Sequence, residues 1–174
     1  MRKIGLIAGG LLLIVGVIMY SYLGGFSEPV ITIEETAPFS VYGYSYEGQL
    51  GNREFGKLFR VADSLVDNAV LKGVVAGVFY NQPSRQEDTV KTFVGVLAAD
   101  TVAATGIERR DYRPGRVIQA TIEAHYLVMP VNIYPKIMEF AKENNIELSG
   151  QSFEIYERKD FLKIRMPVQE ALNK

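Results

Sequence analysis

A glutamate placed among apolar and aromatic residues near the C-terminus is the strongest candidate for chemistry in this sequence. Glu154 lies between Phe153 and Ile155 in a segment that alternates like a β-strand, so it shares one strand face with Tyr156. A carboxylate held among aromatic rings is costly to bury unless a cation pairs with it. The residues alone leave two interpretations: a site that attracts a cation, or a solvated glutamate on an open strand face.

Tyrosine is the second notable residue type, because the chain has ten tyrosines and no tryptophan. Each ring offers an apolar face for stacking a flat ligand and a hydroxyl for hydrogen bonding. Tyr42, Tyr44 and Tyr46 alternate onto one face of a predicted strand. The tyrosines expected to contact a ligand are Tyr44, Tyr46, Tyr80, Tyr126, Tyr134 and Tyr156. For each of them, ordinary packing in a sheet is the alternative.

The remaining polar candidates are weaker. His125 is the single histidine and there is no cysteine, which excludes multi-histidine zinc sites, thiolate chemistry and disulfides. His125 can act as a general base or bind haem iron, but a lone histidine at a strand end is more often a hydrogen-bonded polar residue. We therefore expect no metal and no cofactor. The arginines at 109, 110, 113 and 116 alternate with acidic residues, so we expect a solvated loop there instead of an anion site.

The elements that position these residues follow from hydrophobic periodicity, which switches between two and about 3.6. One helix is expected from Asn52 to Val70, with Gly73 as its stop, and a second from Asn132 to Asn144, with Pro135 in its first turn. The expected strands are residues 30–33, 39–46, 74–80, 90–99, 116–126, 152–158 and 161–168.

This order repeats a β-α-β-β module twice. We predict an α+β fold in which the duplicated modules form one antiparallel sheet with two helices packed on it. A groove is expected near the pseudo-twofold axis, where small ligands commonly bind.

The N-terminal segment has a different character. Residues 4–23 carry no charge, and twenty helical residues span roughly 30 Å, the thickness of a bilayer core. Arg2 and Lys3 precede this run, so the positive-inside rule predicts a cytoplasmic N-terminus at residues 1–3, a transmembrane anchor, a flexible linker at 24–29 and a domain at 30–170 on the non-cytoplasmic face. A cleaved signal peptide is the alternative, although its apolar region is usually shorter, about 7–15 residues.

Composition limits the functions further. The 174 residues are 48% apolar and 22% charged, which fits one globular domain plus the N-terminal segment. The formal net charge is −1. A nucleic-acid-binding protein usually carries a basic face, so no nucleic-acid partner is expected.

Several segments together resemble the GyrI-like (gyrase-inhibitor-like) small-molecule-binding domain, found also as the effector-binding part of AraC-type and MerR-type multidrug regulators. They are residues 44–48 (YSYEG), 79–83 (FYNQP), 93–96 (FVGV), 114–116 (PGR), 124–126 (AHY), 134–140 (YPKIMEF) and, most specifically, 152–156 (SFEIY). The likeness covers about residues 30–168. The chain departs from the family at Leu127-Val128-Met129, where a glycine is usual, and it contains no helix-turn-helix segment.

The resemblance implies that Glu154 lies at the base of a pocket for cationic aromatic ligands. We therefore expect a membrane-tethered domain that binds an amphipathic small molecule as a receptor or sequestering protein. A hydrolase of strained electrophiles, with Glu154 as general base and Tyr156 or Tyr126 as hydrogen-bond donor, is the alternative. A protein-interaction domain with a filled groove is the third hypothesis. The sequence identifies no protein partner.

Overall fold

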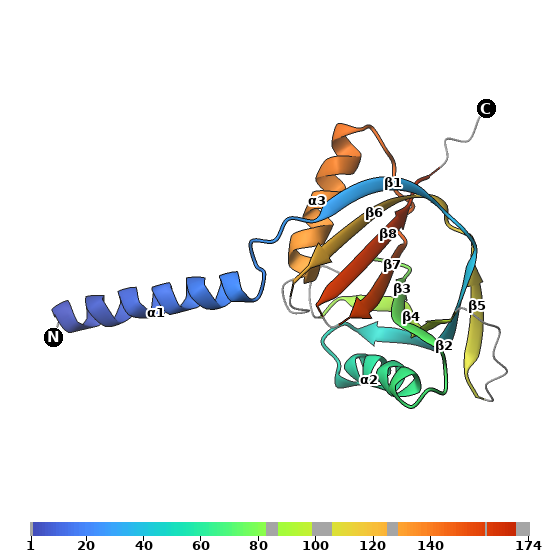
Figure 1. The fold of residues 1–174 in the computed structure, drawn as a ribbon, viewed down its shortest axis with the longest axis horizontal. Helices are drawn as coiled ribbons and strands as arrows, with labels where there is room; N and C mark the ends of the chain where they lie inside the picture. The colour runs from blue at the N-terminus through green and yellow to red at the C-terminus, as the bar shows by residue number, and fades with distance from the viewer. Residues whose placement is uncertain (1, 83–86, 99–105, 125–128, 159, 170–174) are drawn as a thin grey trace.

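The computed structural model of the chain describes residues 2–82, 87–98, 106–124, 129–158 and 160–169, without the side chains of residues 2–9, 129–132 and 158. Three helices and eight strands are present in this part (Figure 1). In chain order they are α1 (Arg2–Tyr22), β1 (Val30–Thr36), β2 (Phe39–Gln49), α2 (Arg53–Asp67), β3 (Gly73–Phe79), β4 (Thr89–Ala98), β5 (Glu108–Tyr112), β6 (Gly115–Glu123), α3 (Met129–Glu143), β7 (Ser152–Arg158) and β8 (Phe161–Pro167).

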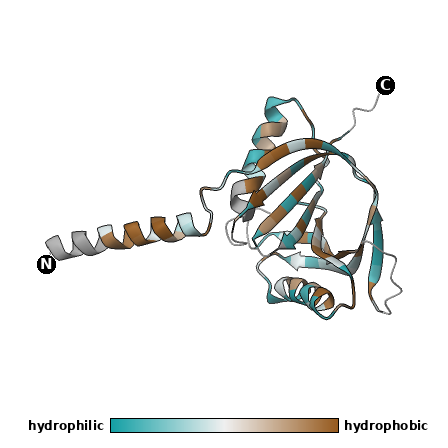
Figure 2. Ribbon diagram, viewed as in Figure 1, coloured by the Kyte–Doolittle hydropathy of each residue, from teal (hydrophilic) through white to brown (hydrophobic). Residues whose placement is uncertain are grey.

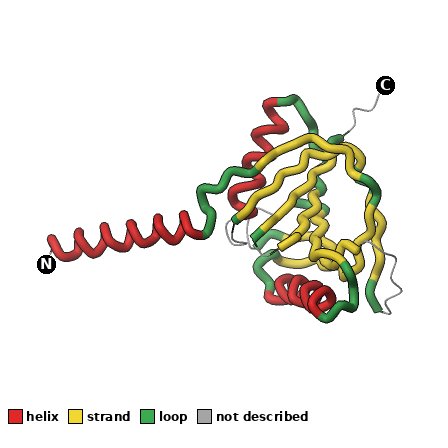
Figure 3. The backbone as a smooth tube through the Cα atoms, in the orientation of Figure 1, coloured by secondary structure: helices red, strands yellow, loops and turns green. Residues whose placement is uncertain are grey.

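The strands form one antiparallel sheet in the order β1-β6-β8-β7-β3-β4-β2-β5. The units β2-α2-β3-β4 and β6-α3-β7-β8 occupy the two halves of this sheet and meet where β3 pairs with β7. β1 forms the outer edge beside β6, and β5 forms the other edge beside β2. The predicted α+β class and the single antiparallel sheet are confirmed. The sheet is strongly curved, as the tube in Figure 3 shows.

β5 corrects the sequence interpretation, which placed Arg109 and Arg110 in a solvated loop. The segment is a strand that pairs with β2 from Gly43↔Glu108 to Phe39↔Tyr112. Its charged side chains pair with one another along the strand, Arg110 with Glu108 and Arg109 with Asp111. Charged residues are common on sheet edges, where they discourage pairing with other chains.

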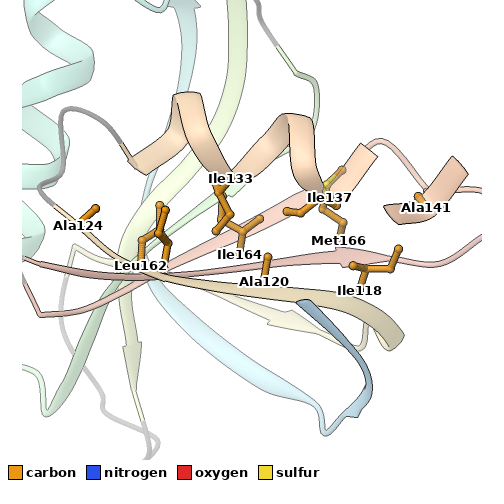
Figure 4. Packing of buried hydrophobic residues seen from close by; sticks show 10 residues of the cluster. Ile118, Ala120, Ala124, Ile133, Ile137, Ala141, Leu162, Ile164 and Met166 are labelled. Atoms are coloured by element: carbon orange, nitrogen blue, oxygen red, sulfur yellow. The ribbon is translucent and has the colours of Figure 1, made fainter. Parts of the chain in front are cut away.

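α3 packs on the half of the sheet that contains β6 and β8 (Figure 4). Ile133, Ile137 and Ala141 lie on its inner side at helical spacing and are almost completely buried. They contact a row of strand residues consisting of Ile118, Ala120, Ile122, Leu162, Ile164 and Met166. This is the larger part of the core.

α2 covers β3, β4 and β2 in the other half, and only Ala62 among its residues is fully buried. Asn52 caps the helix as predicted, because its side chain accepts a hydrogen bond from the amide of Glu54 at 3.0 Å. The predicted stop at Gly73 is wrong. The helix ends at Asp67, where the Asn68 amide group donates to the carbonyl of Ser64 at 2.8 Å and ends the regular turn.

The predicted start of α3 is also wrong, because the helix begins at Met129 and Asn132 lies inside it. Pro130 then falls in the first turn, where its fixed φ and missing N–H are tolerated. Pro135 is inside the helix instead of in its first turn.

α1 extends away from the sheet at the end where β6 finishes (Figure 1). Its described side chains begin at Gly10 and are exposed and largely apolar, with Leu11, Leu12 and Leu13 64–72% exposed (Figure 2). In the part of the chain that the structure describes, no helix combines the length and apolar character that crossing a membrane requires. The structure does not describe the side chains of residues 4–9, which form the first part of the predicted anchor.

Candidate functional site

Glu154 lies on β7, the strand at the centre of the sheet between the two helices, and is only 5% exposed. Phe153 points to the opposite face, where it packs with Val78 and Phe93. Strand alternation therefore directs Glu154 and Tyr156 to the helix-covered face. The interpretation of Glu154 as a solvated residue on an open strand face is wrong.

Both carboxylate oxygens of Glu154 accept hydrogen bonds from tyrosines. The Tyr134 hydroxyl, from α3, donates to Oε1 at 2.6 Å, and the Tyr156 hydroxyl donates to Oε2. The Tyr134 hydroxyl also lies 3.0 Å from Oγ of Ser152. These four residues, Ser152, Glu154, Tyr156 and Tyr134, are called the Glu154 cluster below.

The protonation of the Glu154 cluster follows from its burial. Burial raises the pKa of Glu154 above its usual value, and the hydrogen bonds from Tyr134 and Tyr156 counteract part of that rise. Burial, with the nearby Glu154 carboxylate, raises the pKa of both tyrosines, so they remain protonated donors. None of the ion pairs formed among the described residues involves Glu154. The carboxylate is thus a buried acceptor that is held by neutral donors.

Aromatic side chains of α2 form the neighbouring wall. The ring of Phe59 meets the ring of Tyr156 edge-on at 5.6 Å, and Phe55 meets Phe59 at 5.3 Å. The ring of Tyr46 on β2 lies 5.6 Å from that of Phe55. A row of rings therefore connects β2 through α2 to the Glu154 cluster.

Gly77 on β3 lies directly opposite Glu154 in the β3–β7 pairing. A Cβ atom at this position would approach Cε2 of Phe79 to 2.9 Å and Cζ of Phe59 to 3.5 Å. The rings of Phe79 and Phe59 therefore already occupy the place where a Cβ at position 77 would lie, and glycine permits this close packing beside β7.

The structure brings together only some of the tyrosines that the sequence analysis singled out. Tyr134 and Tyr156 contact Glu154 directly. Tyr46 is connected to it only through the rings of α2, and Tyr44 lies on β2, which is separated from β7 by β4 and β3. Tyr126 and His125 lie outside the described residues.

Tyr80 belongs to the other side of the sheet. Its hydroxyl lies 2.7 Å from that of Tyr112, whose ring packs against Phe153, and Arg110 donates to it at 3.0 Å. The guanidinium of Arg110 also lies 4.4 Å from the centre of the Phe93 ring. Tyr80 is therefore part of a back-face cluster and not of the Glu154 cluster.

Three residues near Glu154 were not among the sequence-predicted site residues: Ser152, Phe59 and Gly77. Ser152 alternates with Glu154 and Tyr156 on the same strand, so strand periodicity alone places it on their face. Phe59 lies on α2, and its contact with Tyr156 depends on how that helix packs over the sheet. Within the described residues, no group of three or more metal-ligating side chains is found.

No protein-family model matches the chain, and no curated protein does. Solved structures do match. An integron cassette protein from the mobile metagenome of Vibrio cholerae is 13% identical with a TM-score of 0.60, over 80% of this chain and 95% of that one. SAV2435 bound to tetraphenylphosphonium is 10% identical with a TM-score of 0.58, over 81% and 94%.

The C-terminal domain of EcmrR is 14% identical with a TM-score of 0.59, over 82% of this chain and 99% of that one. EcmrR in a DNA complex also matches, at 14% identity and a TM-score of 0.61, over 98% of this chain and 68% of the EcmrR chain. At these identities the likeness shows the fold alone, and it is the fold that the resemblance of the sequence predicted.

Proposed function

We propose that this domain binds flat, cationic, amphipathic small molecules at the Glu154 cluster, and that it acts as a receptor or sequestering protein. The observation that carries the proposal is the buried carboxylate of Glu154, which accepts hydrogen bonds from two tyrosines and forms no ion pair with any described residue. A cation beside it would recover part of the free energy that burial of the charge costs.

The surroundings of Glu154 support an aromatic ligand. The hydroxyl of Tyr156 donates to the carboxylate, and its ring packs edge-on against the ring of Phe59. Aromatic rings attract cations through their faces, with about 0.5–2 kcal/mol per contact. The fold is also that of SAV2435, which has been solved with the cation tetraphenylphosphonium.

We further propose that α1 tethers the domain to a membrane, with the domain on the non-cytoplasmic face. Residues 4–23 carry no charge, and the helix backbone extends over 21 residues from Arg2 to Tyr22. The large apolar side chains from Leu11 to Met19 are 46–72% exposed, which is unusual for a helix in water. A bilayer would cover these side chains.

Both proposals are open to direct tests. Full-length protein should remain with the membrane fraction after carbonate extraction, whereas complete release would contradict the tether. For the binding proposal, the chain from Ser27 onward should be titrated with a series of cationic dyes and with neutral dyes of the same shapes. Preference for the cations is expected, and absence of binding to every dye would favour a protein-interaction domain with a filled groove.

Hydrolysis of strained electrophiles is the second candidate function. It is favoured by the raised pKa of Glu154, because a carboxylate of higher pKa is a better general base, and by two tyrosine donors beside it. If this function is correct, the protein should turn over an epoxide substrate, and the Glu154→Gln variant should lose this activity. Binding without turnover would leave the receptor function.

A further inference from the structure

The joint between α1 and the sheet is an ordered turn. The amide of Gly25 donates to the carbonyl of Tyr20 at 2.8 Å, and the amide of Gly24 donates to that of Ser21 at 3.0 Å. Gly24 has φ of 75°. This is the hydrogen-bond pattern of a Schellman helix end, in which glycine adopts the left-handed conformation.

The same turn is packed against the end of the sheet. A Cβ atom on Gly24 would lie 2.9 Å from Cβ of Ala124, which directly follows β6. The amide of Ala124 in turn donates to the carbonyl of Asp160 at 3.0 Å, just before β8. The ring of Tyr20 lies against Gly25 and meets Phe26 edge-on at 5.0 Å. Within the linker predicted at residues 24–29, Gly24 and Gly25 thus form a hydrogen-bonded turn that packs on the sheet.

Exposed apolar and aromatic side chains surround this joint. Tyr22 is 91% exposed, Phe26 66% and Val30 67%. They follow α1 along the chain, with the buried Gly25 between Tyr22 and Phe26 and the exposed Glu28 between Phe26 and Val30. Aromatic residues with this exposure, next to an apolar helix, are typical of the headgroup region of a bilayer. The occupant that fits this surface is a lipid interface.

We infer that the joint at Gly24 and Gly25 fixes the orientation of the domain on the membrane. The end of the sheet at Ala124 then faces the lipid headgroups, with Tyr22, Phe26 and Val30 in contact with them. The other end of the sheet, near Glu147, faces away. A flexible glycine-rich linker would instead leave the orientation free. The inference rests on the proposed membrane tether and is independent of the proposed ligand.

The absence of cysteine from the sequence allows a clean measurement with single labels. Asp160→Cys marks the end near the joint. Glu147→Cys marks the far end, because the carbonyl of Glu147 bonds the amide of Gln169, beside the start of β6. The nine residues of β6 are joined by eight steps of about 3.3 Å, so these ends lie roughly 26 Å apart. Each full-length variant is labelled with a fluorophore and placed in phosphatidylcholine nanodiscs that carry a nitroxide quencher on the headgroups.

The fluorophore at position 160 should be quenched several-fold more strongly than the one at position 147. Gly24→Ala should reduce this difference, because alanine is strained at positive φ and its Cβ would meet Ala124. Gly16→Ala is the matched control, since a Cβ there meets nothing within 4 Å, and it should leave the difference unchanged. Circular dichroism melting of each variant verifies that the domain remains folded.

The possible outcomes distinguish the fixed orientation of the domain from the membrane tether. Retention of the chain in the membrane fraction together with equal quenching at both positions would overturn the fixed orientation and leave the tether. Release from the membrane by carbonate would overturn both. Unequal quenching that persists in Gly24→Ala would show that the turn does not set the orientation.

Discussion

The hydroxyl of Tyr134 on α3 donates a hydrogen bond of 2.6 Å to Oε1 of Glu154 on β7. Through Tyr156, whose ring packs against Phe59 of α2, the same carboxylate is connected to the other helix. The four residues of the Glu154 cluster therefore belong to the unit β6-α3-β7-β8, and the other unit contacts the cluster through Phe59 of α2.

Removal of the Tyr134 hydroxyl should destabilise the domain. Tyr134→Phe leaves one oxygen of a buried carboxylate without its donor, which should cost about 1–3 kcal/mol in the free energy of unfolding. Tyr46→Phe is the matched control, because its hydroxyl donates to the carbonyl of Gln49 at an exposed position, and it should change stability by less than about 0.5 kcal/mol. Urea unfolding measures both, and equal losses would contradict the importance of the Tyr134 bond.

The pH dependence of stability should reveal the buried carboxyl group. Burial raises the pKa of Glu154 in the folded protein, so the unfolded chain loses this proton at lower pH than the folded one. Its contribution to stability is complete below the unfolded pKa of about 4.3 and is lost as the pH rises toward the folded pKa. The stability of wild type relative to Glu154→Gln should therefore decline over this window. A difference that does not vary with pH would show that the pKa is not raised.

The two helices should differ in how strongly they depend on single side chains. Ile137 of α3 is fully buried, so Ile137→Ala should cost about 2–5 kcal/mol. Leu58 of α2 is only half-buried, and Leu58→Ala should cost clearly less. Chemical denaturation of the two variants decides this, and a larger loss at Leu58 would contradict the placement of the main core under α3.

A methyl group at Gly77, opposite Glu154 in the β3–β7 pairing, should affect both stability and binding. In Gly77→Ala the new Cβ would press on the Phe79 ring, which should cost about 1–3 kcal/mol, and it should weaken binding of a bulky cation. Gly56→Ala in α2 is the control, since nothing lies within 4 Å and alanine favours helix by about 0.5–1 kcal/mol. Unchanged affinity in Gly77→Ala would mean that the ligand does not depend on the position of the Phe79 and Phe59 rings beside Gly77.

The sequence predicted the parts of the fold that periodicity determines. The cap at Asn52, the strands around Glu154 and the antiparallel sheet follow from local pattern and turn chemistry. β5 was missed because its residues, ERRDY, contain almost no apolar side chain, and its pairing with β2 depends on a distant segment. Local pattern also misplaced the start of α3, since both Pro130 and Asn132 are compatible with a helix N-terminus.

For the candidate site, the sequence predicted which residues share a face of one strand, but not which residues of different elements meet. Alternation placed Ser152, Glu154 and Tyr156 on one face of β7. It did not show that this face is the helix-covered one, nor that Tyr134 and Phe59, from two different helices, meet there. Tyr80 was included for its residue type, and only the sheet register shows that it belongs to the back face with Tyr112.

The most direct test of the account is the affinity of the domain for a cation with and without the charge of Glu154. Isothermal titration calorimetry should compare wild type and Glu154→Gln, with tetraphenylphosphonium as the probe and a neutral analogue of the same shape as the control ligand. Glutamine retains the size of the side chain and removes its charge. We expect the cation to lose about 1–3 kcal/mol of binding free energy, the range for an interaction with a charged group, and the neutral analogue to be unaffected. Equal affinity of the two proteins for the cation would contradict the assignment of Glu154 to the binding site.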